Sequence, residues 1–368
     1  MEIEECAQID AGQWDAAVAA SDDAWLFHTA AWLEMTASVW PLENRYFAAR
    51  QNGRIVGGFP LQADRPTRWL RPRSAYSTKM GCSGPFVTRD LTGKGRRRVL
   101  QALNDAVLQW ARSGRIESLC CWLPPLAAAN LGNLRGVNPL ALLGWEDVST
   151  HTRIVDLSRP ESELWSDLSE DARYNIRKAE SAGYRVERAQ WPQMLDEYYR
   201  VHVETYRRTG VPPHPRAYFQ GIAERIAAGG HAVLWVCLDR QGGPVAFHNC
   251  GRFAGGAVYW TGCSRSEHLE QGVNYLLVWH ALRGAKADGV QAYDIGEVFP
   301  GAAGGKLHGL SVFKSKFGGQ LYRLYRGELR FPVPWLSRAA RRVLRVPGAI
   351  VRRVAGMIRR KEAEPGEP

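Results

Sequence analysis

Two lysines lie between two phenylalanines in the stretch SVFKSKFGGQL (311–321), just before a pair of glycines. A lysine held beside a reacting carbonyl can stabilise the negative charge that develops on its oxygen. On a β-strand, side chains alternate between faces, so Lys314 and Lys316 would point away from the phenylalanines, and the glycines would let a ligand approach. An edge strand whose lysines prevent aggregation explains the same pattern. The alternation alone favours neither lysine.

The stretch YDIGE (293–297) supplies carboxylates at the end of an expected strand. Asp294 and Glu297 are therefore the best general-base candidates, since a carboxylate beside an amine can accept its proton. Metal and nucleophile chemistry have little support, because the nine histidines are scattered and no zinc-binding or nucleophile-elbow motif occurs. His248, on an expected strand, is interpreted as a core residue.

The segment LSEDARYNIRKAESAGY (168–184) predicts a short helix. Ser169 is a good N-cap, acidic residues follow it, and a glycine ends the segment. Arg173 and Arg177, four residues apart, share one face. Each of them either pairs with the glutamate three positions away or binds substrate.

The elements that would position these residues occur twice. The stretch ARQNGRIVGGFPL (49–61) predicts a β-hairpin with an Asn-Gly turn, and LDRQGGPVAFHNC (238–250) repeats its spacing. A strand, a loop, a helix and another strand follow each hairpin. In order along the chain, these are the strand 84–88, a helix with Val99, Leu103, Val107 and Trp110 on one face, the strand 116–122, the strand 257–262, a helix with Val273, Leu276, Leu277 and His280, and the strand 291–296. The order predicts a duplicated α/β architecture with mixed sheets.

Composition indicates a folded protein. The chain has 368 residues, of which 45% are hydrophobic, and 14 tryptophans, so it can bury a large core and favours two domains. Its seven cysteines include no C-x-x-C pair, which argues against a zinc knuckle and a disulfide scaffold. The first thirty residues contain acids and lack an apolar core, and no run of eighteen apolar residues occurs. We therefore expect a cytoplasmic protein.

The C-terminal tail carries a large share of the charge. The chain has a net charge of +11, and nine basic but only three acidic residues lie beyond position 330. Apolar residues in 335–361 recur at helical spacing, with arginines mostly outside that stripe. Such a basic amphipathic helical tail suits an anionic membrane surface, which would place the protein at the inner face of the membrane. It could instead pack on the protein or contact tRNA phosphates.

The order of several motifs resembles the FemABX family of peptidyl transferases. The resemblance covers roughly residues 20 to 331 and is most specific in the second half. The segments that carry it are FHTAAWLEM (27–35), GCSGPFV (81–87), ARYNIRKAESAGY (172–184), VETYRRTGVPPHPRAYF (203–219), AVYWTGCS (257–264), EQGVNYLLVWHAL (270–282), YDIGE (293–297) and FKSKFGG (313–319).

The resemblance implies two tandem GNAT-like acyltransferase domains. The first would span 1–157 and be completed by a last strand at 319–331, the second would span 158–318, and the tail would be 332–368. It also implies transfer of an aminoacyl group from aminoacyl-tRNA to an amine of a peptidoglycan precursor or another envelope glycoconjugate, with no bound cofactor or metal.

The resemblance also assigns roles to residues. Lys314, with Phe313 beside it, would stabilise the developing oxyanion. Tyr218 and Tyr259 would line the acceptor cleft. The other implied substrate-binding positions are Lys79 at nucleotide-sugar phosphates, Arg216 at a phosphate or carboxylate, Trp260 and Asn274. Where this chain has Glu297, the family commonly has glycine or arginine, which puts that substrate contact in doubt.

Two other functions stay open. GNAT-like folds commonly use acetyl-CoA, whose pyrophosphate sits on a helix N-terminus. The loop SEHLEQGVN (266–274) lacks the expected glycine spacing and offers two glutamates that would repel an anion, whereas RDLTGKGRRR (89–98) is basic and glycine-containing. The first alternative is therefore a CoA-dependent N-acyltransferase acting on an envelope polysaccharide or sugar amine. The second is a non-enzymatic scaffold bound to the membrane.

Overall fold

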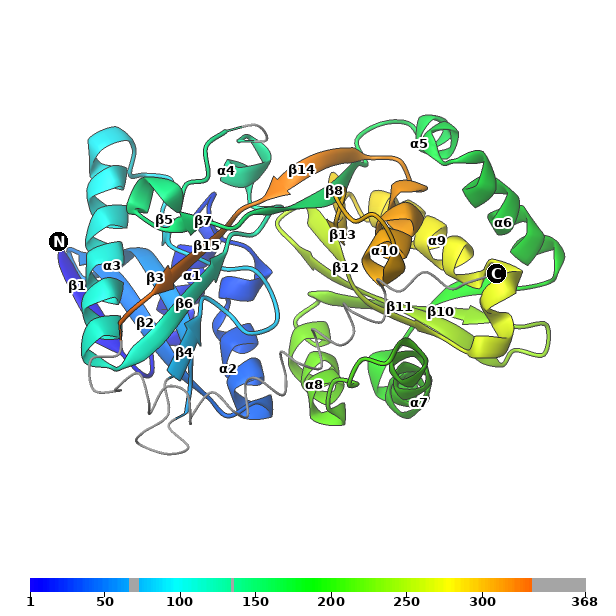
Figure 1. Cartoon of the computed structure of the whole chain (residues 1–368), viewed down its shortest axis with the longest axis horizontal. Helices are drawn as coiled ribbons and strands as arrows, with labels where there is room; N and C mark the ends of the chain where they lie inside the picture. Colours follow the sequence, from blue (N-terminus) through cyan, green and yellow to red (C-terminus); the bar gives the residue numbers. More distant parts are fainter. Residues whose placement is uncertain (66–72, 134–135, 333–368) are drawn as a thin grey trace, which may run out of the picture.

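Two mixed β-sheets lie next to each other and helices cover their faces (Figure 1). The structure, a computed structural model, describes residues 1–65, 73–133 and 136–332. Within these residues, one sheet has eight strands in the order β1-β2-β3-β4-β6-β15-β7, with β5 paired to β3. The other has seven strands in the order β14-β8-β13-β12-β11-β10-β9. The expected amphipathic tail lies outside the described residues.

The first half contains the elements before residue 150. Its strands are β1 (Glu2–Cys6), β2 (Leu42–Gln51), β3 (Arg54–Asp64), β4 (Arg73–Tyr76), β5 (Phe86–Val87), β6 (Ile116–Trp122) and β7 (Glu146–Asp147). Its helices are α1 (Ala11–Ala19), α2 (Ala30–Val39), α3 (Gly93–Ser113) and α4 (Ala128–Leu131).

The second half contains the elements that follow. Its strands are β8 (Thr150–Asp156), β9 (Arg185–Ala189), β10 (Ala232–Leu238), β11 (Pro244–Phe253), β12 (Gly256–Ser264), β13 (Ala292–Val298), β14 (Gln320–Leu324) and β15 (Arg326–Arg330). Its helices are α5 (Glu161–Asp167), α6 (Glu170–Ser181), α7 (Trp191–Thr209), α8 (Arg216–Gly221), α9 (Val273–Ala287) and α10 (Gly305–Ser315).

The duplication predicted from the sequence is confirmed in the strand order. Both hairpins form, β2 with β3 and β10 with β11, and the first turns at Asn52 and Gly53, which have φ values of 51° and 77°. In each half the strand after the hairpin pairs in parallel with a strand that follows a long helix: β4 with β6, and β12 with β13. The helices α3 and α9 bury the apolar faces expected of them.

The two sheets are joined by strands exchanged between the halves. β14 pairs with β8 in the second sheet, whereas β15, one residue later, pairs with β6 and β7 in the first. The segment expected as one strand over 319–331 is thus two strands in different sheets. Since β7 and β8 are also consecutive, two antiparallel segments cross together from one sheet to the other (Figure 1).

One hydrophobic cluster spans both halves. Trp32 of α2 and Phe27, just before α2, lie 4.8 and 5.6 Å from the Trp260 ring of β12. Trp32 also contacts Tyr218 of α8 at 6.3 Å, edge to face. Burying aromatic rings of both halves in one core fixes the two sheets relative to each other.

Among residues 1–65, 73–133 and 136–332, no helix combines the length and the apolar character that a membrane span needs.

Candidate active site

A helix carries Lys314, and the strand expected from the sequence is wrong. α10 packs against β13 and ends at Ser315. The glycines at 318–319 then adopt φ values of 73° and 76°, which glycine tolerates, and stop the helix. The strand prediction failed because Phe313 and Phe317, four residues apart, fit one face of a helix as well as one face of a strand. Their rings lie 5.1 Å apart.

The helix separates the two lysines that the sequence could not distinguish. The Lys316 ammonium lies 2.6 Å from the Asp171 carboxylate, in an exposed ion pair that raises its pKa. The Lys314 Nζ points inward and donates a hydrogen bond of 2.9 Å to the Glu297 carbonyl oxygen. Among the described residues, its other two N–H bonds have no hydrogen-bond partner. Lys314 therefore has donors to spare for a ligand.

Burial tunes the charge of Lys314. Loss of hydration lowers the pKa of its ammonium to about 8, against the attraction of Asp294 and Glu297, which raises it. At neutral pH the group is still mostly protonated. It is a cation placed in a poorly hydrated position, where its interaction with a developing negative charge is strong.

A bulge in β13 makes room for this ammonium. The register against β8 shifts between Asp294 and Gly296, and Gly296 has φ of 92°, which glycine adopts without strain. A Cβ at this position would lie 2.8 Å from the Lys314 Nζ. Only glycine at 296 therefore leaves Lys314 in contact with the strand.

Asp294 is held by the same bulge. Its Oδ1 accepts the Thr152 hydroxyl at 2.5 Å and the Gly296 N–H at 2.7 Å. Burial raises the pKa of this carboxyl, while those two hydrogen bonds and the Lys314 charge oppose the rise. Asp294 is only 4% exposed and already accepts two hydrogen bonds. It is therefore better placed to stabilise the positive charge of Lys314 than to contact a substrate.

Glu297 connects the lysine cluster, which consists of Lys314, Asp294, Gly296 and Glu297, to the other sheet. Its Oε1 lies 2.9 Å from the Arg326 Nη1 of β15. The Arg326 guanidinium in turn lies 4.0 Å from the centre of the Trp122 ring of β6. Burial raises the pKa of the Cys82 thiol, in the loop after β4, to about 12, and the nearby charges of Arg326, Asp294 and Glu297 also affect this pKa. The cluster therefore lies at the seam between the halves.

The strands separate beside Lys314. β12 and β13 pair only from Gly256–Val258 to Ala292–Asp294, after which β12 follows β11 and β13 follows β8. The Tyr259 carbonyl oxygen would lie 3.8 Å from a Cβ at Gly296, so Tyr259, Gly296 and Lys314 meet where the strands part. The gap between β12 and β13 and an ammonium with two unused donors form a candidate site for a reacting acyl group.

The predicted tyrosines lie on opposite faces of the second sheet. Tyr259 packs its ring 4.0 Å from His248 on the α9 side, next to the lysine cluster. Tyr218 is fully buried in the aromatic core that faces the first half. Its hydroxyl faces the Trp260 indole, with no well-aligned hydrogen bond to any described residue. Tyr259 is the better placed of the two to affect Lys314.

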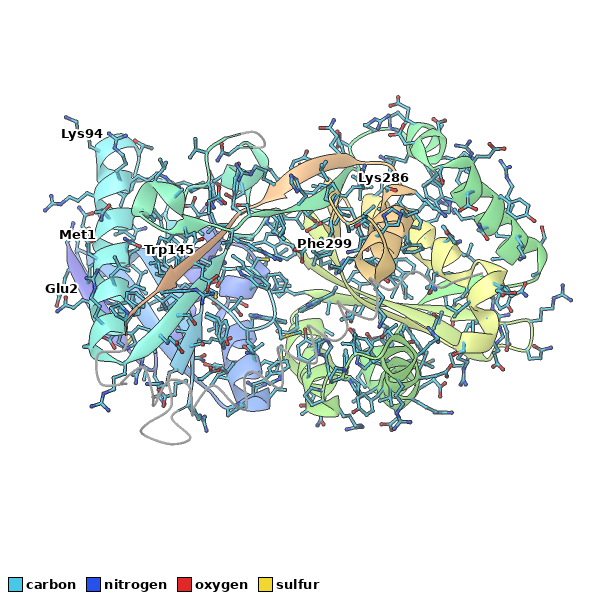
Figure 2. All side chains as sticks on the ribbon, in the orientation of Figure 1. Met1, Glu2, Lys94, Trp145, Lys286 and Phe299 are labelled. Carbon is cyan, nitrogen blue, oxygen red and sulfur yellow. The ribbon has the colours of Figure 1, made fainter. Side chains whose placement is uncertain are left out.

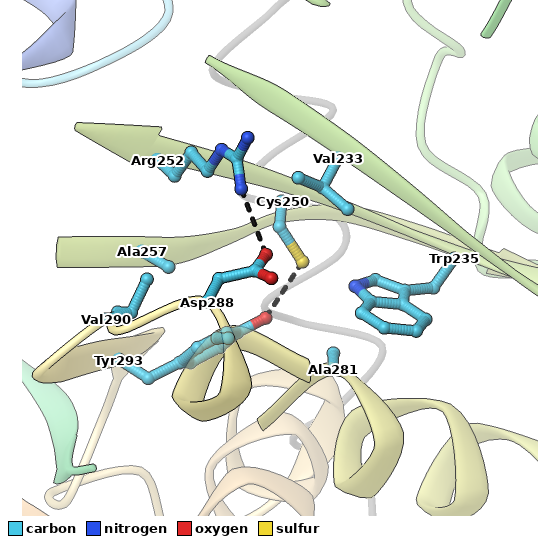
Figure 3. A pocket seen from close by; sticks show the side chains of 10 residues that line it. Val233, Trp235, Cys250, Arg252, Ala257, Ala281, Asp288, Val290 and Tyr293 are labelled. Carbon is cyan, nitrogen blue, oxygen red and sulfur yellow. Dashed lines mark hydrogen bonds and ion pairs between the residues drawn. The ribbon is translucent and has the colours of Figure 1, made fainter. Parts of the chain in front are cut away.

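His248 is a hydrogen-bonded core residue. Its Nε2 lies 2.6 Å from the Tyr293 hydroxyl, which also lies 3.0 Å from the Cys250 Sγ. Figure 3 shows the Cys250 and Tyr293 contact next to the surface ion pair of Arg252 with Asp288. Burial lowers the pKa of His248 to about 3, so this imidazole is neutral at physiological pH. The network fills the space under the second sheet.

The remaining predicted binding residues are dispersed. Arg173 donates to the carbonyls of Ser166 and Leu168, and Arg177 stacks on Trp165, so neither forms the glutamate pair expected from spacing. The other three lie elsewhere. Lys79 lies 4.1 Å above the Tyr76 ring, Arg216 pairs with Asp196 at 2.6 Å, and Asn274 donates to Ser264.

The start of α9 is covered by the chain itself. The Asn175 carbonyl oxygen of α6 would lie 2.4 Å from a Cβ at Gly272, the residue before α9. Lys178 donates to the Glu270 carbonyl oxygen at 2.7 Å. α6 therefore occupies the space beside the N-terminus of α9, where an anion would otherwise bind.

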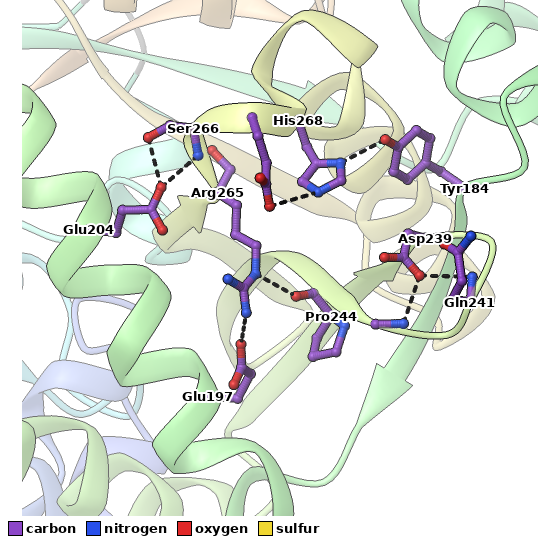
Figure 4. A network of polar contacts seen from close by, with 12 residues as sticks. Tyr184, Glu197, Glu204, Asp239, Gln241, Pro244, Arg265, Ser266 and His268 are labelled. Carbon is purple, nitrogen blue, oxygen red and sulfur yellow. Dashed lines mark hydrogen bonds and ion pairs between the residues drawn. The ribbon is translucent and has the colours of Figure 1, made fainter.

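The loop before α9 is also tied into local pairs (Figure 4). Glu204 accepts both the backbone N–H and the hydroxyl of Ser266, at 2.7 Å each. Arg265 contacts Glu197 at 2.6 Å, so its charge is already compensated. The loop thus offers acidic side chains and a neutralised arginine rather than free donors.

Several residues in or around the lysine cluster were not found from the sequence. Thr152, Gly296, Arg326 and Trp122 come from four strands, and only Gly296 is near a motif that was singled out. Their contacts depend on strand pairing between distant parts of the chain. Thr152 and Asp294, for example, are 142 residues apart, and no local pattern signals their contact. The glycine in YDIGE was the one available signal.

Comparisons with known proteins agree with this architecture. The family model described as an acetyltransferase (GNAT) domain matches residues 166–306. No curated protein matches the sequence significantly. A crystal structure of FemX superposes with a TM-score of 0.68 at 16% identity, covering 90% of this chain and 98% of FemX.

Two other solved structures cover the chain equally well. L-PGS from Bacillus licheniformis gives a TM-score of 0.53 at 14% identity, over 91% of this chain and 95% of that one. A conserved protein of unknown function from Bacteroides thetaiotaomicron gives 0.57 at 12% identity, over 89% and 100%. The chain therefore has a tandem GNAT fold, and most of its second half matches the acetyltransferase (GNAT) domain model. The resemblance to FemABX drawn from the sequence is confirmed at the level of the fold.

Proposed function

We propose that this protein is an aminoacyltransferase that moves an aminoacyl group from aminoacyl-tRNA to an amine of a peptidoglycan precursor or a related peptide. The observation that carries the proposal is the position of Lys314. Its protonated Nζ is anchored on the Glu297 carbonyl where β12 and β13 separate, with two donors unused by the described residues.

This position suits attack on an ester. When an amine adds to the ester carbonyl, negative charge grows on the carbonyl oxygen and then on the departing ribose oxygen. A preorganised ammonium lowers the barrier for both steps, and removing one such donor typically costs about 3 kcal/mol of transition-state stabilisation. Glu297, which is 26% exposed in its side chain, is better placed than Asp294 to accept the proton of the attacking amine.

The donor is inferred from the start of α9. A CoA pyrophosphate needs free N–H groups at a helix N-terminus. Here the Asn175 carbonyl lies against Gly272, and Glu267 and Glu270 lie on the preceding turn. The likeness to FemX over both halves supports a donor other than CoA. An aminoacyl ester on tRNA fits the chemistry of Lys314 without a pyrophosphate site.

The acceptor is proposed by analogy with the same neighbours. The resemblance of the sequence to the FemABX family implies the amine of a peptidoglycan precursor. A solved domain from Agrobacterium fabrum, with a TM-score of 0.53 at 13% identity, is described as part of a putative lysylphosphatidylglycerol synthetase. That name adds a lipid hydroxyl as an acceptor to be compared in the same assay.

Transfer assays with labelled donors test the proposal. The protein is incubated separately with a full set of charged tRNAs and with acetyl-CoA, each with a peptidoglycan-precursor peptide or phosphatidylglycerol, and label on the acceptor is followed. We expect transfer from one or a few aminoacyl-tRNAs, lost by at least a hundredfold in Lys314→Met. Lys316→Met is the matched control, because its ammonium is paired with Asp171 at the surface.

The second candidate is a CoA-dependent N-acyltransferase acting on a sugar amine. The match of residues 166–306 to an acetyltransferase domain favours it. Transfer from acetyl-CoA, with none from any charged tRNA, would replace the first proposal by this one. If neither donor reacts with any acceptor, both enzyme proposals fail and a scaffold role remains.

A further inference from the structure

A second pocket lies in the first half, away from Lys314. It has a volume of about 430 Å³ and lies between α3, α4 and residues 139–143. Five leucines form the main apolar part of its wall: Leu100, Leu123, Leu140, Leu142 and Leu143. A volume in this range is typical of small-molecule sites. The lysine cluster contributes no residue to it, so the pocket needs an explanation of its own.

The wall of this pocket is unusually exposed at its rim. Leu142 is 76% exposed, although Leu140, two residues earlier, is fully buried. Contact of this leucine and the apolar cavity with water is unfavourable. A bound apolar chain would cover this surface and so gain binding free energy. The pocket is therefore suited to an extended hydrocarbon group.

One end of the pocket is basic. Arg96 and Arg97, in the first turns of α3, both line it. Arg96 is compensated by Asp23, at 2.5 Å. Arg97 is exposed and forms no ion pair or hydrogen bond with the described residues. Lys94, which projects from the same end of α3 (Figure 2), adds to the positive field. An anionic group at this end would meet an unpaired guanidinium.

We infer that this pocket binds an anionic amphiphile, with the apolar chain among the leucines and the anionic head group on Arg97. The two features are complementary only in such a ligand. A neutral hydrocarbon leaves Arg97 unused, and a short anion leaves the leucine wall in water. The basic C-terminal tail is a poor occupant, because it would bring nine further basic residues toward Arg97.

The inference is tested by calorimetry on the full-length protein with alkyl phosphates below their micelle concentrations. From octyl to dodecyl phosphate, affinity should rise about fourfold per methylene until the pocket is full. Dodecyltrimethylammonium, with the same chain and opposite charge, should bind at least tenfold more weakly than dodecyl phosphate. No binding of dodecyl phosphate, or equal binding of the cationic probe, overturns the inference.

Variants separate the pocket from the general basic surface. Arg97→Glu should weaken dodecyl phosphate at least tenfold, whereas Arg98→Glu, on the same helix but outside the pocket, should change it less than twofold. Leu100→Trp fills the cavity and should abolish binding, and Leu142→Asp at the exposed rim is a second variant that should not disturb folding. Equal losses in Arg97→Glu and Arg98→Glu, or full binding by Leu100→Trp and Leu142→Asp, would overturn it.

Sedimentation with lipid vesicles shows whether the ligand is a membrane lipid or a free amphiphile. Vesicles of phosphatidylglycerol and phosphatidylcholine are sedimented with the wild-type protein and with Leu100→Trp. Loss of sedimentation in the variant assigns a membrane lipid as the ligand, and unchanged sedimentation assigns a free amphiphile.

Discussion

Replacing Lys314 by methionine should make the protein more stable while removing its activity. Methionine has a similar length and no charge, so it removes the burden of a poorly hydrated ammonium. At about 1.4 kcal/mol per pKa unit, the decrease from 10.5 to about 8 corresponds to about 3 kcal/mol. Because the side chain is only partly buried, solvent screening reduces the expected gain to about 1 to 2 kcal/mol.

The pH dependence of this gain follows from the direction of the shift. The folded state loses the Lys314 proton near pH 8 and the unfolded state near pH 10.5. The cost of the charge is therefore fully present below pH 8, decreases between pH 8 and 10.5, and is absent above that range. The stability advantage of Lys314→Met should follow the same course.

Urea unfolding of wild type and Lys314→Met at pH 7 and pH 10, monitored by tryptophan fluorescence, measures this difference. Lys316→Met is the control, and it should lose about 0.5 kcal/mol because an exposed ion pair with Asp171 is removed. A Lys314→Met protein that is less stable than wild type at pH 7, or whose difference from wild type is the same at both pH values, would show that the Lys314 ammonium is not destabilised by burial.

Three further predictions concern catalysis by the same cluster. The transfer rate should fall about tenfold between pH 7 and pH 9 as Lys314 loses its proton, measured after subtracting donor hydrolysis; a flat profile contradicts its role as a cation. Gly296→Ala should lower the transfer rate at least tenfold by displacing Lys314, whereas Gly255→Ala, with similar backbone strain of about 1 to 2 kcal/mol but open space around it, should lower only stability. Arg326→Met should reduce kcat more than Arg323→Met, because only Arg326 holds Glu297; equal effects would argue against this contact.

Local patterns were sufficient to predict much of the fold. The Asn-Gly turn between two apolar runs specified the first hairpin, and Val99, Leu103 and Val107 specified the buried face of α3. Ser169 caps α6 as expected, accepting the Ala172 N–H at 3.1 Å. These features depend on contacts within a few residues, so the sequence contains the information directly.

Residues 313–319 show where local patterns fail. Phe-Lys-Ser-Lys-Phe satisfies both a period of two and an i, i+4 spacing, and five residues are too few to separate them. The glycine pair decided the outcome, since its positive φ values end a helix. The identity of Lys314 as the inward-pointing lysine then follows from the packing of α10 on β13, which no local pattern contains.

The candidate site needed strand pairing that the sequence does not display. Thr152 reaches Asp294 because β8 pairs with β13, and Arg326 reaches Glu297 because β15 crosses into the first sheet. Arg173 and Arg177 show the opposite case, since a conspicuous motif serves local contacts with α5. Prominence in the sequence and position in the site are therefore independent in this chain.

The difference between the duplicated halves explains why only one of them can hold such a lysine. In the first half, β4 stays paired with β6 to its end, and the Ser77 N–H then donates to the Cys120 carbonyl. In the second half, β12 leaves β13 after Val258, and the bulge at Gly296 widens the separation. Two strands that stay paired have no free backbone groups between them to contact an ammonium on a neighbouring helix. Two strands that separate do have such groups. Arg326 instead reaches Glu297 from the first sheet, where its strand β15 pairs with β6 and β7, so both sheets contribute side chains to the site.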